Sequence, residues 1–170
     1  MKSYRLTVAL AVLGMATLLG SPLTAGENRN FVTAMSGADE VPARDSHGRG
    51  VAIFHVSEDG TEIAYKLIVA NIENVVAAHI HVGAVGVNGP VVVGLFSGAA
   101  GGGRTDGPIA EGVFTAADLT GPLAGLTLSD LLDEMEAGNA YVNVHTNDGI
   151  APTNTGPGDF PGGEIRGQIK

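Results

Sequence analysis

The chain has 170 residues, a length that suits one domain with a core of useful size. Apolar residues make up 44% and charged residues 16% of the sequence, a balance that excludes a chain disordered from end to end. Lys and Arg total 9 against 18 Asp and Glu, for a net charge of −9 without any basic run, so nucleic acid is not an expected partner.

The first 25 residues have the pattern of a secretory signal peptide. Lys2 and Arg5 are followed by an apolar run over residues 6–19 and by a short exit of small residues over 21–25. The run is shorter than the ~20 residues that span a bilayer, and no cysteine follows it, so we expect no membrane anchor after cleavage. Residues 26–170 would then form one exported domain, periplasmic or extracellular, and losing two positive charges would change the net charge to −11.

The remainder of the chain is predicted to be all-β. Short β-branched runs alternate with turn residues, which is typical of an antiparallel sandwich or barrel. We expect strands at residues 31–35, 50–56, 61–71, 75–82, 90–96, 109–115, 139–145 and 163–169. Between them the longer loops are 37–49, 83–89, 97–108 and 146–162.

One short helix is predicted between the sixth and seventh strands. Thr127 followed by Asp130 resembles a capping box, and Gly138 supplies a stop. Apolar residues recur between them at helical spacing, at Leu128, Leu131, Leu132 and Met135. We interpret this stripe as core packing.

Histidines are the candidate metal ligands, because the chain has no cysteine and therefore no thiolate ligand or disulfide. His79 and His81 are two residues apart in a predicted strand, so both project from one face while Ile80 points into the core. Such a pair of imidazoles can chelate copper or zinc. The alternative is that each histidine is a surface residue paired with a nearby carboxylate.

Two later strands show the same alternation. Tyr141, Asn143 and His145 are predicted to share the outer face of one strand, and the last strand places Glu164, Arg166 and Gln168 outward. If these strands are neighbours of the first, His79, His81 and His145 converge with Arg166 close by. The sequence does not show whether the strands are neighbours.

Four segments in the same order resemble the CHRD domain, which is named from chordin. They are Ala78–Gly83, Gly86–Val92, Gly138–Thr146 and Pro161–Ile169, and the resemblance extends from about Phe31 to Lys170. It implies an all-β fold, an immunoglobulin-like or superoxide-dismutase-like antiparallel β-sandwich or barrel. It implies little about activity.

A more distant resemblance is to copper–zinc superoxide dismutases. His79, His81, His145 and Arg166 stand in the order of a His-x-His strand, a later strand ending in His, and a final strand with Arg. This similarity implies copper on the outer face of the sheet under long loops, with the arginine attracting an anion. However, no histidine lies between His81 and His145, and no disulfide is possible, so copper binding carries over better than dismutation.

A fourth ligand is less well defined. His55 projects outward from its strand and is the weaker candidate, while His47 lies in a loop. Asp148 and Asp159 lie in the loop before the last strand, where they can supply oxygen ligands or act only as turn formers.

Our leading hypothesis is an exported protein that binds a transition metal, copper above all, through His79, His81 and His145. One alternative is a metal-free interaction module whose outer polar face binds an extracellular protein or a glycan. Another is a superoxide dismutase-like redox enzyme in which Arg166 attracts the anion. The acidic charge attracts cations and repels superoxide, so it favours metal binding over catalysis.

Overall fold

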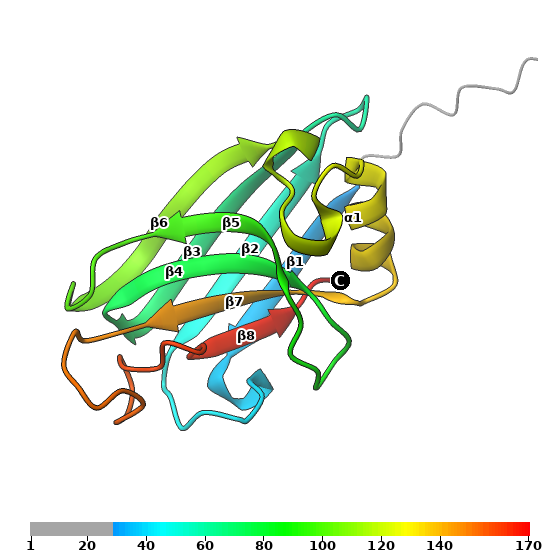
Figure 1. Ribbon diagram of the computed structural model, residues 1–170. Coiled ribbons are helices and arrows are strands. Elements are labelled where there is room, and N and C mark those ends of the chain that lie inside the picture. Colours follow the sequence, from blue (N-terminus) through cyan, green and yellow to red (C-terminus); the bar gives the residue numbers. More distant parts are fainter. Residues whose placement is uncertain (1–28) are drawn as a thin grey trace, which may run out of the picture.

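The fold is described by a computed structural model, which covers residues 29–170 (Figure 1). The predicted signal peptide, residues 1–25, lies outside the described residues. Within them, no helix is both long and apolar enough to cross a membrane.

Eight antiparallel strands form one sheet with the order β5-β4-β7-β8-β1-β2-β3-β6. The predicted all-β fold is therefore confirmed. The strands are β1 Asn30–Ser36, β2 Arg49–Val56, β3 Ile63–Glu73, β4 Val75–Val82, β5 Val91–Ser97, β6 Arg104–Phe114, β7 Ala140–Thr146 and β8 Ile165–Gln168. The sheet curls into a nearly closed barrel, with β5, β4, β7 and β8 in one layer and β1, β2, β3 and β6 in the other (Figure 1). The core lies between these layers.

The two edge strands, β5 and β6, come close without pairing in the sheet order. The Tyr65 hydroxyl on β3 donates a hydrogen bond of 2.9 Å to the Leu95 carbonyl on β5, across this gap. Three 3₁₀ helices, Gly37–Asp39 (η1), Ala116–Asp118 (η2) and Gly121–Leu123 (η3), complete the connections. Because Thr120 N donates to Val92 O at 2.8 Å, the segment between η2 and η3 covers part of the β5 edge.

Helix α1, Leu128–Glu136, confirms the predicted helix. The Asp130 carboxylate accepts hydrogen bonds from the Thr127 backbone N–H at 2.8 Å and from its hydroxyl at 2.6 Å, which ties the first turn together. Its buried residues are those of the predicted stripe: Leu128, Leu131, Leu132 and Met135. The helix therefore packs onto the barrel core beside the start of β7, and the long loop after β7 lies at the other end of that strand (Figure 1).

The bounds of β3, β6 and β8 differ from the sequence-based expectation. β6 begins at Arg104 rather than 109, so the predicted 97–108 loop is shorter. The reason is that β3 also continues, to Glu73, and Glu73 pairs with Arg104 beyond an irregularity between Val69 and Ile72. β8 is shorter than predicted, and begins at Ile165.

Candidate metal centre

Strands β4 and β7 are adjacent, and their alternation places the three candidate histidines on one face. Ala78 and Ile80 are fully buried in the core, while His79 and His81 project from the outer side of β4. His79 pairs with Asn143 across the strands, and Ala77 pairs with His145, so His145 is the diagonal neighbour of His79. The predicted convergence of these histidines is therefore present in the fold.

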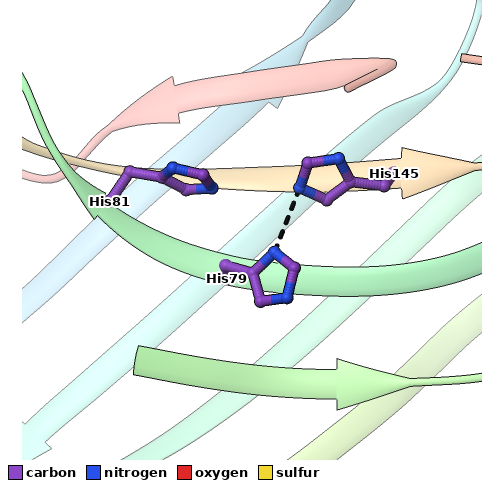
Figure 2. A group of neighbouring side chains, drawn as sticks. All are labelled: His79, His81 and His145. Carbon is purple, nitrogen blue, oxygen red and sulfur yellow. Dashed lines mark hydrogen bonds between the residues drawn. The ribbon is translucent and has the colours of Figure 1, made fainter. Parts of the chain in front are cut away.

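The imidazoles face one another at short range (Figure 2). His79 Nδ1 lies 3.1 Å from His145 Nε2, and one ring nitrogen from each of the three histidines lies within 4.8 Å of the others. The ring centroids are 5.0 to 6.0 Å apart. His79 and His145 are partly exposed and His81 is buried, so the group opens to solvent on one side.

Backbone carbonyls fix the tautomers of two of these rings. His145 Nδ1 lies 2.9 Å from Pro161 O, and His81 Nδ1 lies 2.9 Å from Gly89 O. Because a carbonyl only accepts, each Nδ1 carries the proton and each Nε2 keeps its lone pair. His81 Nε2 is buried and has no hydrogen-bond partner among the described residues. These outer contacts orient imidazoles as the outer shell of a metal site does.

The three imidazoles are held in the neutral form that a metal requires. Burial lowers the pKa of His79 and of His81, and it lowers the pKa of His145 to about 4. The positive charge that each histidine would bring to the others lowers the His145 pKa further, against the opposing effect of the Pro161 carbonyl. At neutral pH the cluster therefore presents lone pairs rather than charges.

The loop of residues 83–89, which we call the cover loop, lies over the neighbouring part of this face. The Tyr141 ring stacks on His81 with centroids 4.8 Å apart, and the Arg166 guanidinium lies 3.4 Å from the centre of the Tyr141 ring. The Tyr141 hydroxyl accepts from Gly89 N at 3.0 Å, and Arg166 donates to the Ala84 carbonyl at 3.1 Å. The side chains beside the histidines thus hold the cover loop in place.

The outer side chains of β7 and β8 are polar, but most of them are not exposed to solvent. They alternate with the core residues as predicted, but the loops bury them. Tyr141 is 2% exposed, Asn143 3%, Glu164 1% and Arg166 1%. The outer face is therefore a second, polar interior.

Two buried carboxylates belong to that polar interior. Glu164 accepts hydrogen bonds from the Ser46 hydroxyl at 2.6 Å, the Thr146 hydroxyl at 2.6 Å and Gly158 N at 2.7 Å, so it ties two loops to β7. Glu40, which follows η1, accepts a hydrogen bond of 2.8 Å from the Asn143 amide. Glu40 is not evident as a functional residue from the sequence, because a single glutamate in a polar loop carries no pattern.

The additional candidate ligands lie elsewhere. His55 is on β2, three strands from β7, and its ring contacts the Asn30 side chain. His47 lies exposed in the loop before β2. Asp159 is buried and accepts from the Thr155 N–H at 3.0 Å, whereas Asp148 accepts from Ile150 N at 2.8 Å as a turn former. Neither histidine and neither aspartate is in the ligand group described above.

Comparison with known proteins gives one match. The family model of the CHRD domain matches residues 31–169, which is most of the chain and all of the barrel from β1 to β8. No curated protein and no solved structure matches the chain significantly.

Proposed function

The chain belongs to the CHRD domain family, and from this premise we propose that it is an exported protein that binds a transition metal, copper above all, through His79, His81 and His145. Export is supported by the signal-like pattern of residues 1–25, which the sequence alone provides. Metal binding is supported by one observation above all: three neutral imidazoles from two adjacent strands bring one nitrogen each to within 4.8 Å of the others.

The spacing of the nitrogens fits a metal. Two nitrogens that each lie ~2.0–2.1 Å from one ion are about 3 Å apart at angles between right and tetrahedral. His79 Nδ1 and His145 Nε2 are 3.1 Å apart. The widest separation in the group is within 4.8 Å, so completing the site needs a movement of up to about 1.5 Å by the third ring.

Ligand type favours copper among the divalent metals. Imidazole suits copper and zinc, and Cu(II) heads the affinity order for such nitrogen sites. The surrounding protein is acidic, with a net charge of −9, which raises the local concentration of cations. A metal bound between His79 Nδ1 and His145 Nε2 would take the place of their hydrogen bond, with His79 then carrying its proton on Nε2.

A redox enzyme receives less support. Arg166 would have to meet an incoming anion, yet it is 1% exposed, lies over Tyr141 and donates to the Ala84 carbonyl. Its contacts support a role in holding the cover loop beside His81. We therefore propose metal binding without superoxide turnover.

The test is a calorimetric titration of metal-free protein with Cu(II), comparing the wild type with His79→Ala and His145→Ala. We expect one tight equivalent in the wild type and an affinity at least 100-fold lower in each variant, because each loses one of three ligands. His55→Ala is the matched control, since His55 is exposed on β2 and should leave copper uptake unchanged. Equal uptake by the wild type and both site variants would exclude this site.

A further inference from the structure

A second cavity, whose lining includes none of His79, His81 and His145, lies where β2 begins, β3 ends and β6 begins. Its volume is about 650 Å³, within the range of small-molecule sites. Side chains that line it with polar groups are His47, Arg49, Asn71, Glu73, Arg104 and Glu164. Two of the nine Lys and Arg residues of an acidic chain therefore face one cavity.

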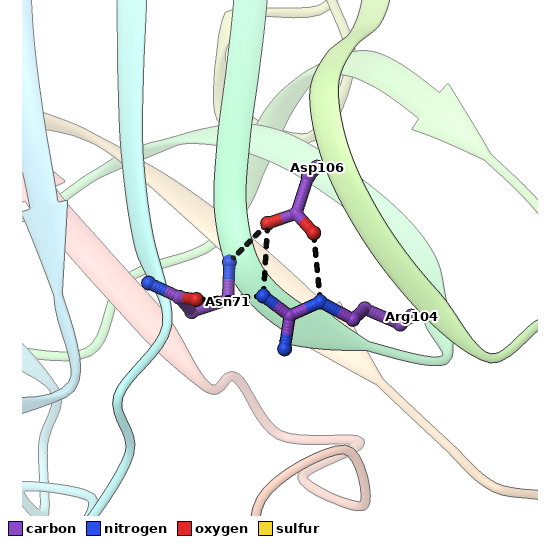
Figure 3. Close-up of polar contacts among 3 residues, drawn as sticks. All are labelled: Asn71, Arg104 and Asp106. Atoms are coloured by element: carbon purple, nitrogen blue, oxygen red, sulfur yellow. Dashed lines mark hydrogen bonds and ion pairs between the residues drawn. The ribbon is translucent and has the colours of Figure 1, made fainter.

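The first arginine, Arg104, is oriented by hydrogen bonds to Asp106 and Asn71 (Figure 3). Arg104 Nε donates to Asp106 Oδ2 at 2.7 Å, and its Nη2 donates to Asn71 Oδ1 at 2.8 Å. Asp106 Oδ1 also accepts from Asn71 N at 2.7 Å, at the irregular end of β3. Because Asn71 accepts through its oxygen, its amide nitrogen points away from Arg104, and Arg104 Nη1 also has no partner among residues 29–170. Both groups remain available as donors.

The second arginine is oriented without being neutralised. Arg49 Nη1 donates to Gly48 O at 2.7 Å, a backbone carbonyl. Among residues 29–170 no carboxylate lies within ion-pair distance of Arg49. His47, two residues earlier, is exposed at the same cavity. This side of the cavity therefore offers N–H donors and one uncompensated positive charge.

The two glutamates of the cavity differ in what they can still accept. Both oxygens of Glu164 already accept hydrogen bonds, from Ser46, Thr146 and Gly158. Glu73 is exposed at the end of β3, and in the described structure its carboxylate has no hydrogen-bond partner. Glu73 is thus a free acceptor in the same cavity as the donors and pairs across the strands with Arg104, which suits hydroxyl groups on a ligand.

We propose that this cavity binds a small ligand that combines an anionic oxygen group with hydroxyl groups, the chemistry of an acidic sugar. The anionic group, a carboxylate, sulfate or phosphate, is held by Arg49, Arg104 and the Asn71 amide, because guanidinium groups match such oxygens in geometry and charge. Glu73 accepts from the ligand hydroxyls. This site is separate from the proposed metal centre and does not depend on it.

Calorimetry of the full mature protein tests the proposal with three probes: digalacturonate, neutral digalactose and inorganic phosphate. We expect digalacturonate to bind the wild type, and Arg49→Gln and Arg104→Gln each to lower that affinity at least tenfold. Lys66→Gln is the charge-matched control, because Lys66 is exposed and pairs with Glu111 at 3.5 Å outside the cavity. Absence of digalacturonate binding, or equal binding by wild type, Arg49→Gln and Lys66→Gln, overturns the proposal.

A glutamate variant separates the two halves of the ligand. Glu73→Gln should strengthen phosphate binding, because it removes a negative charge from the cavity. It should strengthen digalacturonate binding less, because it also alters the acceptor for the ligand hydroxyls. If digalactose binds as tightly as digalacturonate, the proposed recognition of the anionic group by the arginines is overturned. If phosphate binds as tightly as digalacturonate, the proposed recognition of the ligand hydroxyls is overturned. If Arg104→Gln disturbs folding, the comparison of Arg49→Gln with the wild type decides the outcome. His145→Ala, which alters the proposed metal centre, should bind digalacturonate with the affinity of the wild type.

Discussion

Glu40 is an ionisable residue in the polar interior beside the histidine group, and its burial there alters its pKa. It is 6% exposed, and burial raises its pKa from 4.5 to about 7, although the Val41 backbone, the Asn143 amide and the charges of Arg166 and Arg44 all act in the opposite direction. Desolvation therefore outweighs every favourable contact. At neutral pH a large fraction of Glu40 is protonated in the folded protein.

The raised pKa predicts a stability that falls as the pH rises. Between pH 4.5 and about 7 the folded state binds more proton at Glu40 than the unfolded state, so the free energy of unfolding decreases through this range and stays lower above it. Glu40→Gln keeps the acceptor for Asn143 and removes the charge, so it should stabilise the protein at pH 8 by on the order of 2 kcal/mol and have little effect at pH 4. Urea unfolding at both pH values measures this, with the exposed Glu62→Gln as control. A stability loss at pH 8 would contradict the assignment.

At the scale of elements, the cover loop of residues 83–89 contacts both the histidine group and the side chains of β7 and β8 beside it. Gly89 O accepts from His81 Nδ1, and the backbone N–H of Gly89 donates to the Tyr141 hydroxyl. The residue can approach β4 this closely only as glycine, because a Cβ there would lie 1.7 Å from Val82 O. The orientation of His81 therefore depends on the absence of one side chain.

Gly89→Ala should displace the cover loop from β4 and release His81 Nδ1. We expect the Cu(II) affinity to fall ten- to 100-fold, the range typical for loss of an outer-shell hydrogen bond. Gly94→Ala is the matched control, because Gly94 lies on β5 opposite His79 and its added Cβ would meet nothing within 4 Å. Calorimetric titration of both variants measures the difference, and equal affinities would show that the Gly89 carbonyl does not orient His81.

How much the sequence could predict is clearest from these same strands. The alternation of Ala78, His79 and Ile80 predicts the outer face correctly, because side-chain parity is a local property of a strand. It does not reveal that Asn143 and Arg166 are buried, since their cover comes from loops distant in sequence. The same limit hides Glu40, and the early start of β6 follows from pairing with β3, which no local pattern encodes.

At the scale of the whole molecule, the barrel wall separates two interiors. The apolar core lies inside, and the three histidines of the candidate metal centre lie outside on the same strands, as Ile80 and its neighbours His79 and His81 show. Helix α1 contributes Leu131, fully buried, to the apolar side. Stability from the core and affinity at the metal centre should therefore be separable.

Leu131→Ala tests that separation. Removing a fully buried leucine should lower the free energy of unfolding by about 2–5 kcal/mol, because it leaves a cavity under α1. Excess Cu(II), at ~100 times its dissociation constant, should add about 2.7 kcal/mol to the wild type and the same amount to Leu131→Ala, since binding to the folded state stabilises it by mass action. His145→Ala, whose affinity is expected to be at least 100-fold lower, should gain no more than about 0.4 kcal/mol. Urea unfolding with and without Cu(II) measures the copper effect on the free energy of unfolding of the wild type and both variants. A smaller copper effect in Leu131→Ala would mean that packing in the core affects the position of the histidines on the outer face.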